Sequence, residues 1–153
     1  MARDLLLDVN VVLDICLPRP AFAPDALRAL DRCHQEGGRL WLYAGSVQTL
    51  EYTLLNSLLQ QARTQGTPLS RPQAQYLSRQ LLQAFCADKS WLAALAGDGH
   101  VFDAPDPEDE QLVRALQRRR PGSMQLLTRD QRLIDTHPTL AVTPAAYLAE
   151  AAR

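Results

Sequence analysis

The sequence predicts an α/β protein with a three-layer α/β/α arrangement around a central parallel sheet of four to five strands. Short apolar segments typical of buried strands alternate along the chain with longer segments of helical periodicity. Helical segments separate the strand segments, and parallel strands need such crossover connections. Because 153 residues are enough to build one sizeable core, we expect a single domain over residues 1–153.

The first part of the chain predicts two strands and two helices. The apolar segment 5–9 is short and is followed by turn-forming residues, which indicates a buried strand. A short helix over 10–17 is expected to end before Pro18. A helix over 24–35 has a proline near its start and two glycines after its end, the usual placement of these residues. Residues 39–43 are the second expected strand.

The middle of the chain is expected to be mainly helical. Ser46 is the expected cap of a long helix that runs to about residue 61, and a loop follows at 65–68. Ser70 opens a helix to about residue 87, with a proline in its first turn. Ser90 is the expected cap of a short helix to residue 96. A turn at 97–99 then leads to a short third strand at 100–102.

The last part returns to the alternation of strands and helices. Asp106 and Pro107 open a helix that stops before Pro121. We expect the remaining elements to be a strand at 124–128, a helical turn at 131–135, a short strand at 140–142 and a terminal helix over 144–152.

Composition and charge limit the classes of function. The net charge is −1, which excludes a strongly basic nucleic-acid binder, so any nucleic-acid site must depend on a local basic patch or on metal ions. No apolar segment approaches the roughly 20 residues that span a membrane. The N-terminus lacks the form of a signal peptide, and we expect a cytoplasmic protein. The cysteines Cys16, Cys33 and Cys86 show no metal-binding spacing and are expected to be reduced.

Four acidic residues occupy positions that favour a site. Asp8 and Asp130 each follow an apolar strand segment, and parallel sheets bind ligands beyond the carboxyl ends of their strands. Glu51 and Asp109 each fall inside the apolar stripe of an expected helix, where an unneutralised carboxylate is costly. Simpler roles stay open: helix caps for Asp8 and Asp130, a first-turn acid for Asp109, and an arginine or solvent contact for Glu51. Glu108 and Glu110 are expected to be solvated.

The residue types favour a hard divalent cation. Carboxylate oxygens are the ligands of Mg²⁺ and Mn²⁺, and the chain has no cluster of histidines and cysteines typical of softer metals. A group of acids with such a cation points to phosphodiester chemistry.

Four segments of the chain resemble the motifs of the PIN-domain family, whose members include the VapC-type ribonuclease toxins. They are residues 7–14, 46–51, 106–110 and 126–133. The resemblance spans roughly residues 4–148 and implies an α/β/α fold with a parallel sheet. The segment from about residue 65 to 99 matches no motif of the family and is expected to be a helical insertion. It also implies a Mg²⁺- or Mn²⁺-dependent endoribonuclease of single-stranded RNA, often a homodimer and often held by an antitoxin protein.

The resemblance also implies the roles of particular residues. The ligands are Asp8, Glu51, Asp109 and Asp130, and the supporting residues are Asn10, Asp14, Thr128 and Asp106. Arginines near the motifs are expected to hold the RNA backbone, namely Arg129, Arg132, Arg118 and Arg119. For the arginines after the third motif, favourable placement of cations at a helix C-terminus is the alternative.

Two other functions compete with the nuclease. A PIN-like domain without catalysis can serve as a scaffold that binds RNA or protein. A phosphatase of the haloacid-dehalogenase type also opens with a strand and an acid, but that chemistry needs a second aspartate two residues later, where this chain has Asn10.

Overall fold

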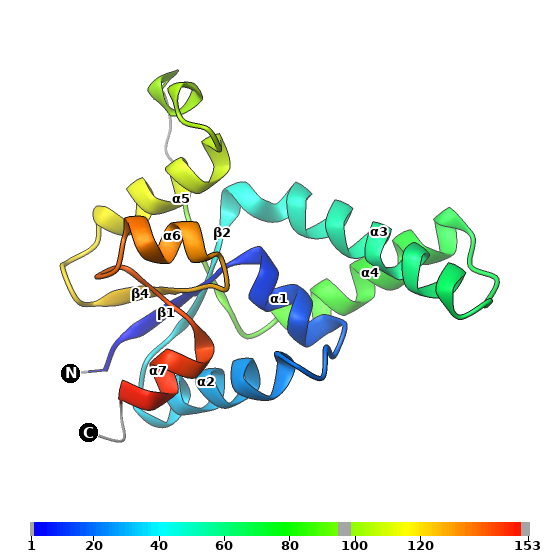
Figure 1. The fold of residues 1–153 in the computed structure, drawn as a ribbon, viewed down its shortest axis with the longest axis horizontal. Helices are drawn as coiled ribbons and strands as arrows, with labels where there is room; N and C mark the ends of the chain where they lie inside the picture. The colour runs from blue at the N-terminus through cyan, green and yellow to red at the C-terminus, as the bar shows by residue number, and fades with distance from the viewer. Residues whose placement is uncertain (1, 95–98, 151–153) are drawn as a thin grey trace.

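A computed structural model describes residues 2–94 and 99–150 of the chain (Figure 1). Five strands form one all-parallel sheet in the order β3-β2-β1-β4-β5. The strands are β1 (Asp4–Leu7), β2 (Leu40–Tyr43), β3 (Ser90–Leu92), β4 (Met124–Leu127) and β5 (Ala141–Val142). The α/β class and the parallel central sheet predicted from the sequence are confirmed.

Helices cover both faces of the sheet and produce three layers. The α-helices are α1 (Val9–Cys16), α2 (Ala23–Gln35), α3 (Val47–Thr64), α4 (Arg71–Cys86), α5 (Pro107–Gln117), α6 (Gln131–Thr136) and α7 (Pro144–Glu150). Two short 3-10 helices, η1 (Ala44–Ser46) and η2 (Gly99–Asp103), complete the described elements. In the described ranges, no helix is both long and apolar enough to cross a membrane.

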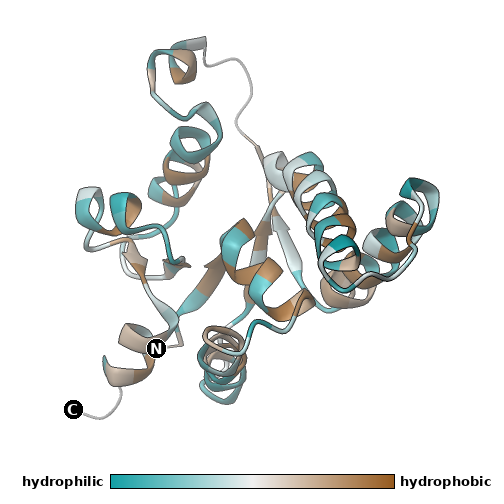
Figure 2. Ribbon diagram, turned by 45° about the vertical axis from the view of Figure 1, so that its right-hand side comes forward, coloured by the Kyte–Doolittle hydropathy of each residue, from teal (hydrophilic) through white to brown (hydrophobic). Residues whose placement is uncertain are grey.

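The alternation of side chains along β1 divides the core in two. Leu5 and Leu7 pack with α1, α2 and α7 on one face, whereas Leu6 packs with α5 and α6 on the other. All three leucines are almost fully buried, which explains why a continuous apolar segment forms this central strand. Hydrophobic residues gather on the strands and on the helix faces turned toward them (Figure 2).

The winding of the chain reverses between β1 and β4. Strands β2 and β3 extend the sheet on one side of β1, whereas β4 and β5 extend it on the other. Leu7 and Leu127 are partners in this register, so the residues after both strands emerge side by side at the carboxyl edge. In open α/β sheets this reversal leaves a crevice at that edge, and ligands bind there.

Two predictions of elements in the middle of the chain are wrong. Residues 90–92 form the edge strand β3, in parallel with β2 at Trp41, and not the start of a helix. Residues 100–102 belong to the 3-10 helix η2 and not to a strand, with Val101 buried and Phe102 exposed. Both segments are too short for periodicity to separate a strand from a helix. Residues 95–98 of the expected helix and turn, and residues 151–152 of the expected last helix, lie outside the described residues.

Helices α3 and α4 lie side by side and project from the sheet (Figure 1). The expected insertion at 65–99 contributes α4 and also the edge strand β3, so it is not purely helical. Ser70 opens α4 with a reciprocal capping box, in which Gln73 accepts from the Ser70 backbone and the Ser70 hydroxyl accepts from the Gln73 backbone. The three cysteines are free; Cys33 is buried and the other two are half-buried.

Candidate functional site

A cleft of about 330 Å³ lies at the carboxyl edge of the sheet, where the winding reverses. It is built from the β1–α1 junction, the first turns of α3, the N-terminal end of α5 and the β4–α6 junction. Its polar lining residues are Asp8, Asn10, Thr49, Thr53, Asp106, Glu108, Asp109 and Asp130. Three of the four predicted ligands therefore line one cavity.

Asp8 is a buried carboxylate at the start of α1. Its Oδ1 accepts from the Val9 backbone N–H (2.7 Å), and its Oδ2 accepts from Thr128 Oγ1 (2.5 Å) and Asn10 Nδ2 (2.8 Å). Burial raises the pKa of Asp8, whereas the hydrogen bonds from Thr128 and Val9 oppose that rise and Asp130 adds to it. Asp8 is thus both a helix cap and a member of the acidic group.

Asn10 and Thr128 join the two strand ends, as their predicted supporting role requires. The Asn10 Oδ1 accepts from the Arg129 backbone N–H (3.0 Å). The Thr128 Oγ1, which is fully buried, donates to Asp8 and accepts from the Asp130 backbone N–H (2.9 Å). These bonds hold the Asp8 and Asp130 backbones in one arrangement.

Asp130 caps α6 with one oxygen and keeps the other available. Its Oδ1 accepts from the backbone N–H groups of Arg132 (2.8 Å) and Leu133 (3.3 Å). Within the described structure, its Oδ2 accepts no hydrogen bond. The capping alternative considered from the sequence is therefore correct for Asp130, and it does not exclude a ligand role because capping occupies only Oδ1.

Asp109 is a half-buried acid of the cleft with a strongly raised pKa. Burial raises its pKa to about 6, and the neighbouring carboxylates Asp106 and Asp8 add to the rise. The Arg132 Nη2 donates to Asp109 Oδ2 at 2.6 Å and lowers the pKa, but it does not offset the other causes. Asp106 is exposed and caps α5 by accepting from the backbone N–H groups of Glu108 and Asp109.

Replacing Asp109 with asparagine is expected to stabilise the metal-free protein at neutral pH. Between its ordinary pKa of 3.8 and about 6, the folded protein keeps a proton that the unfolded chain releases, so the free energy of unfolding falls as the pH rises. This loss of unfolding free energy persists above pH 6 and is about 3 kcal/mol. Urea denaturation across this pH range, without divalent metal, measures it. The variant makes the fall smaller and leaves the part that comes from the raised pKa of Asp8. Asp31→Asn, at an exposed position of α2, leaves the whole fall in place; equal pH profiles for parent and D109N contradict the expectation.

The structure does not bring Glu51 into the cleft. The Arg79 Nε of α4 donates to Glu51 Oε1 at 2.7 Å, and this contact lowers the pKa of Glu51. On α3 the cleft is lined instead by Thr49 and Thr53, which lie on a different side of the helix from Glu51. The apolar stripe of α3 packs against α4 as well as the core, so a position in that stripe does not specify the sheet edge. Glu51 therefore leaves the set of candidate ligands, and the arginine alternative describes its contact.

Glu108 is the functional candidate that sequence reasoning missed. It lines the cleft and accepts hydrogen bonds from the hydroxyls of Ser46 and Thr49, which tie the start of α5 to the start of α3. The prediction that Glu108 is solvated is wrong. Ser46 is the N-cap residue of α3, as predicted, but its hydroxyl donates to Glu108 and makes no capping bond to the helix backbone. The only signal in the sequence was a pair of hydroxyl residues at the start of α3, which does not identify a partner some sixty positions away.

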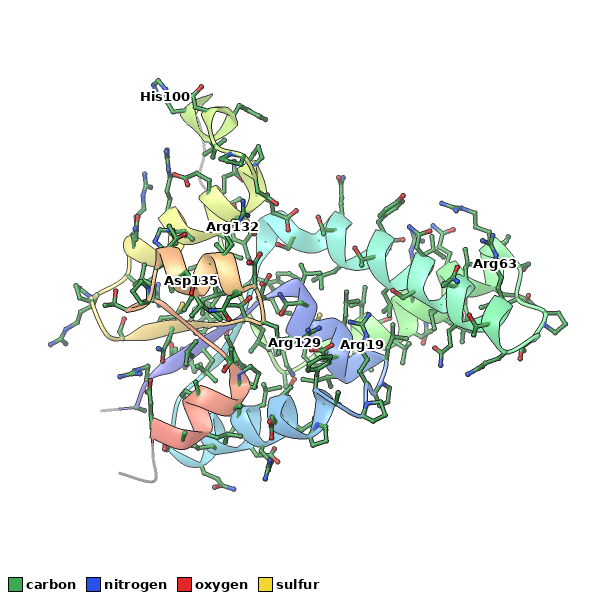
Figure 3. All side chains as sticks on the ribbon, viewed as in Figure 1. Arg19, Arg63, His100, Arg129, Arg132 and Asp135 are labelled. Carbon is green, nitrogen blue, oxygen red and sulfur yellow. The ribbon has the colours of Figure 1, made fainter. Side chains whose placement is uncertain are left out.

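The four predicted RNA-binding arginines have different surroundings. Arg132 donates to Asp109 but does not itself line the cleft. The Arg129 guanidinium turns to the α1 side, beside Arg19 (Figure 3), and donates to the buried Asp14. Arg118 and Arg119 follow the C-terminal end of α5, whereas the cleft lies at its N-terminal end, about 16 Å away for an 11-residue helix. Arg119 instead lies over the Trp41 ring at 5.0 Å.

The side chains that line the cleft offer oxygen atoms, which suit a hard cation, but their carboxylates are not arranged as the ligands of a metal ion. In the described ranges, no group of three or more histidine, cysteine, aspartate or glutamate residues is arranged to hold a metal ion. All the candidate donors are oxygens. Burial is the main cause of the raised pKa of Asp109, and repulsion from Asp106 and Asp8 adds to it; a bound cation favours the charged carboxylate against both. The Arg132 guanidinium now provides positive charge beside Asp109.

Comparisons with protein-family models, with curated proteins and with solved structures found no match to this chain. The resemblance to the PIN-domain family therefore stays a prediction based on the four sequence motifs.

Proposed function

We propose that the protein is a metal-dependent endoribonuclease that hydrolyses phosphodiester bonds of single-stranded RNA, with Mg²⁺ or Mn²⁺ as its cofactor. The observation that carries the proposal is the cleft at the reversal of the sheet, where Asp8, Asp109 and Asp130 come from separate elements. Its lining includes no histidine or cysteine, and hard divalent cations prefer such oxygen ligands.

The chain's own residues have distinct tasks in this proposal. Asp8, Asp109 and Asp130 hold the cation, and Asn10 and Thr128 orient Asp8 through hydrogen bonds to its Oδ2. When bound, the cation lowers the pKa of a coordinated water and polarises a phosphate oxygen. Once Asp109 has a metal partner, the half-exposed Arg132 guanidinium is available to bind a phosphate of the RNA.

Charge supports a single strand as the substrate. A net charge of −1 and an acidic cleft give weak attraction for a duplex backbone, so binding must depend on unpaired bases and on the cation. The proposal includes a cytoplasmic location and, as partners, an antitoxin protein and a second copy of the chain. Exposed apolar side chains on α4, Leu77 and Leu81, support a protein partner.

One observation favours a scaffold without catalysis. The Asp109–Arg132 ion pair neutralises one acid of the cleft internally, and a protein that never binds a cation has reason to keep such a pair. In that case the cleft is an RNA- or protein-binding surface of the same fold.

Incubation with a mixed RNA pool, in Mn²⁺ and separately in EDTA, tests the proposal by sequencing the RNA ends. We expect new ends in Mn²⁺ and none in EDTA. Mn²⁺ at a hundred times its dissociation constant is expected to stabilise the fold by about 2.7 kcal/mol, which a thermal-shift titration detects. If Mn²⁺ produces no new RNA ends and no thermal shift, the scaffold is supported. A thermal shift without new ends shows that the protein binds the cation but does not use it to cleave RNA.

A further inference from the structure

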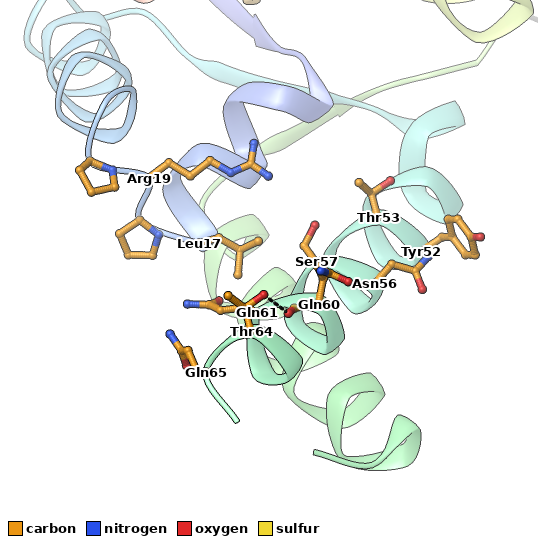
Figure 4. Close-up of a pocket in the computed structure, with 12 residues that line it drawn as sticks. Leu17, Arg19, Tyr52, Thr53, Asn56, Ser57, Gln60, Gln61, Thr64 and Gln65 are labelled. Atoms are coloured by element: carbon orange, nitrogen blue, oxygen red, sulfur yellow. Dashed lines mark hydrogen bonds between the residues drawn. The ribbon is translucent and has the colours of Figure 1, made fainter. Parts of the chain in front are cut away.

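A groove of about 750 Å³ runs beside α3, next to the acidic cleft (Figure 4). One wall is the loop after α1, which carries Leu17 and Arg19. The other wall is the face of α3 that carries Thr53, Asn56 and Gln60. We call this cavity the α3 groove.

The α3 groove is continuous with the acidic cleft. Thr53 lines both cavities, and Thr49, one helical turn before it, lines the cleft. From Thr53 to Thr64 the helix spans about 16 Å, and stacked nucleotides rise about 3.4 Å each along a strand. A strand whose phosphate lies in the cleft can therefore extend several nucleotides along the groove.

The chemistry of the α3 groove differs from that of the cleft. Among the described residues that line it, none has a carboxylate, and Arg19 is the only one with a charge. Its α3 wall carries uncharged hydroxyls and amides, whereas solvated helix faces usually carry charges. An amide offers both donors and acceptors, which match the edges of unpaired bases better than they match a phosphate.

Tyr52 adds an aromatic surface to the α3 groove. It is 65% exposed, lines the α3 groove and is adjacent in sequence to Thr53. An exposed aromatic ring in such a place is a platform on which a base can stack.

We propose that the α3 groove binds the unpaired bases of single-stranded RNA next to the bond cleaved in the acidic cleft. Tyr52 stacks on a base, and the Asn56 and Gln60 amides contact base edges and so select the sequence that is cut. The Arg19 guanidinium, which is partly exposed beside its contact with Asp14, binds a backbone phosphate. This inference rests on the proposed nuclease function, but the binding that it describes does not need the cation.

Fluorescence anisotropy with labelled octaribonucleotides of A, C, G or U, in EDTA and low salt, tests the binding. We expect Tyr52→Ala to weaken binding by at least about fivefold, whereas Tyr52→Phe stays within about twofold of the parent because the ring remains. Asn56→Ala and Gln60→Ala are expected to reduce the differences among the four octamers. Tyr76→Ala is the matched control, since Tyr76 is 64% exposed on α4 and does not line the groove.

The outcomes separate this inference from the nuclease proposal. The inference is overturned if the octamers bind Y52A and Q60A as tightly as they bind the parent protein. It is also overturned if the parent protein binds none of the four octamers. If Mn²⁺ supports cleavage while these variants cut the same sites at the parent rate, the groove assignment fails and the nuclease stands. If the variants lose binding but the parent cuts no RNA, the nuclease fails and the groove stands.

Discussion

Replacing Asp130 with asparagine is expected to reduce Mn²⁺-dependent RNA cleavage by at least about 100-fold while the fold stays intact. Asparagine caps a helix as well as aspartate does, so its side-chain oxygen keeps the bonds that Oδ1 makes to the Arg132 and Leu133 backbones. The change falls on Oδ2, which loses its charge and its ability to bind a cation. Initial rates on a single-stranded RNA that the parent protein cuts measure the effect.

The controls for D130N separate loss of the site from loss of the fold. Asp135→Asn removes a carboxylate from the exposed side of the same helix, where Asp135 accepts from Gln131, and it is expected to cut at the parent rate. The midpoint of thermal unfolding of D130N without metal is expected to equal or exceed that of the parent, because one repulsive charge is gone from beside Asp8. Parent-rate cleavage by D130N removes Asp130 from the site. Asp8→Asn is expected to lose cleavage too, although its amide would face the Asn10 amide.

The part of the site that the sequence predicted is the part that strand topology determines. Asp8 and Asp130 follow apolar segments, and all parallel strands end at the same edge of their sheet, so the two acids meet without any knowledge of side-chain packing. The same rule was available for the arginines after α5. A crossover helix between parallel strands begins at the carboxyl edge and ends at the other, which places Arg118 and Arg119 away from Asp109.

The part that the sequence could not predict depends on which helix lies beside which. The interpretation of Glu51 assumed that the apolar stripe of α3 faces the sheet edge, but α4 packs along α3 and supplies Arg79. The contact between Glu108 and the hydroxyls of Ser46 and Thr49 joins two helices far apart in the chain, so no local pattern encodes it. For the segment 90–92, the partner strand β2 decides the conformation.

Replacing Asp14 with alanine is expected to lower the free energy of unfolding by about 3–5 kcal/mol, the usual cost of removing one partner from a buried ion pair. Asp14 is only 1% exposed, and the Arg129 guanidinium binds it through both Nε and Nη2, the latter at 2.9 Å. Arg19 adds a third contact at 3.2 Å, and Arg129 also stacks on the Phe22 ring at 3.8 Å. The variant leaves the Arg129 charge in this half-buried place without its carboxylate. Urea denaturation measures the loss.

The matched control for D14A is Asp25→Ala, which removes an exposed partner of Arg28 and is expected to cost less than about 1 kcal/mol. Arg129→Lys keeps the charge but loses the two-pronged contact with Asp14, so its cost is expected to lie between the two. Because the Arg129 backbone also binds Asn10, and Thr128 and Asp130 flank Arg129 in the chain, loss of this pair is expected to loosen the β4–α6 junction. The D14A variant is therefore expected to lose cleavage activity at temperatures well below its own melting temperature. A cost for D14A no greater than that for D25A shows that the pair does not hold the junction.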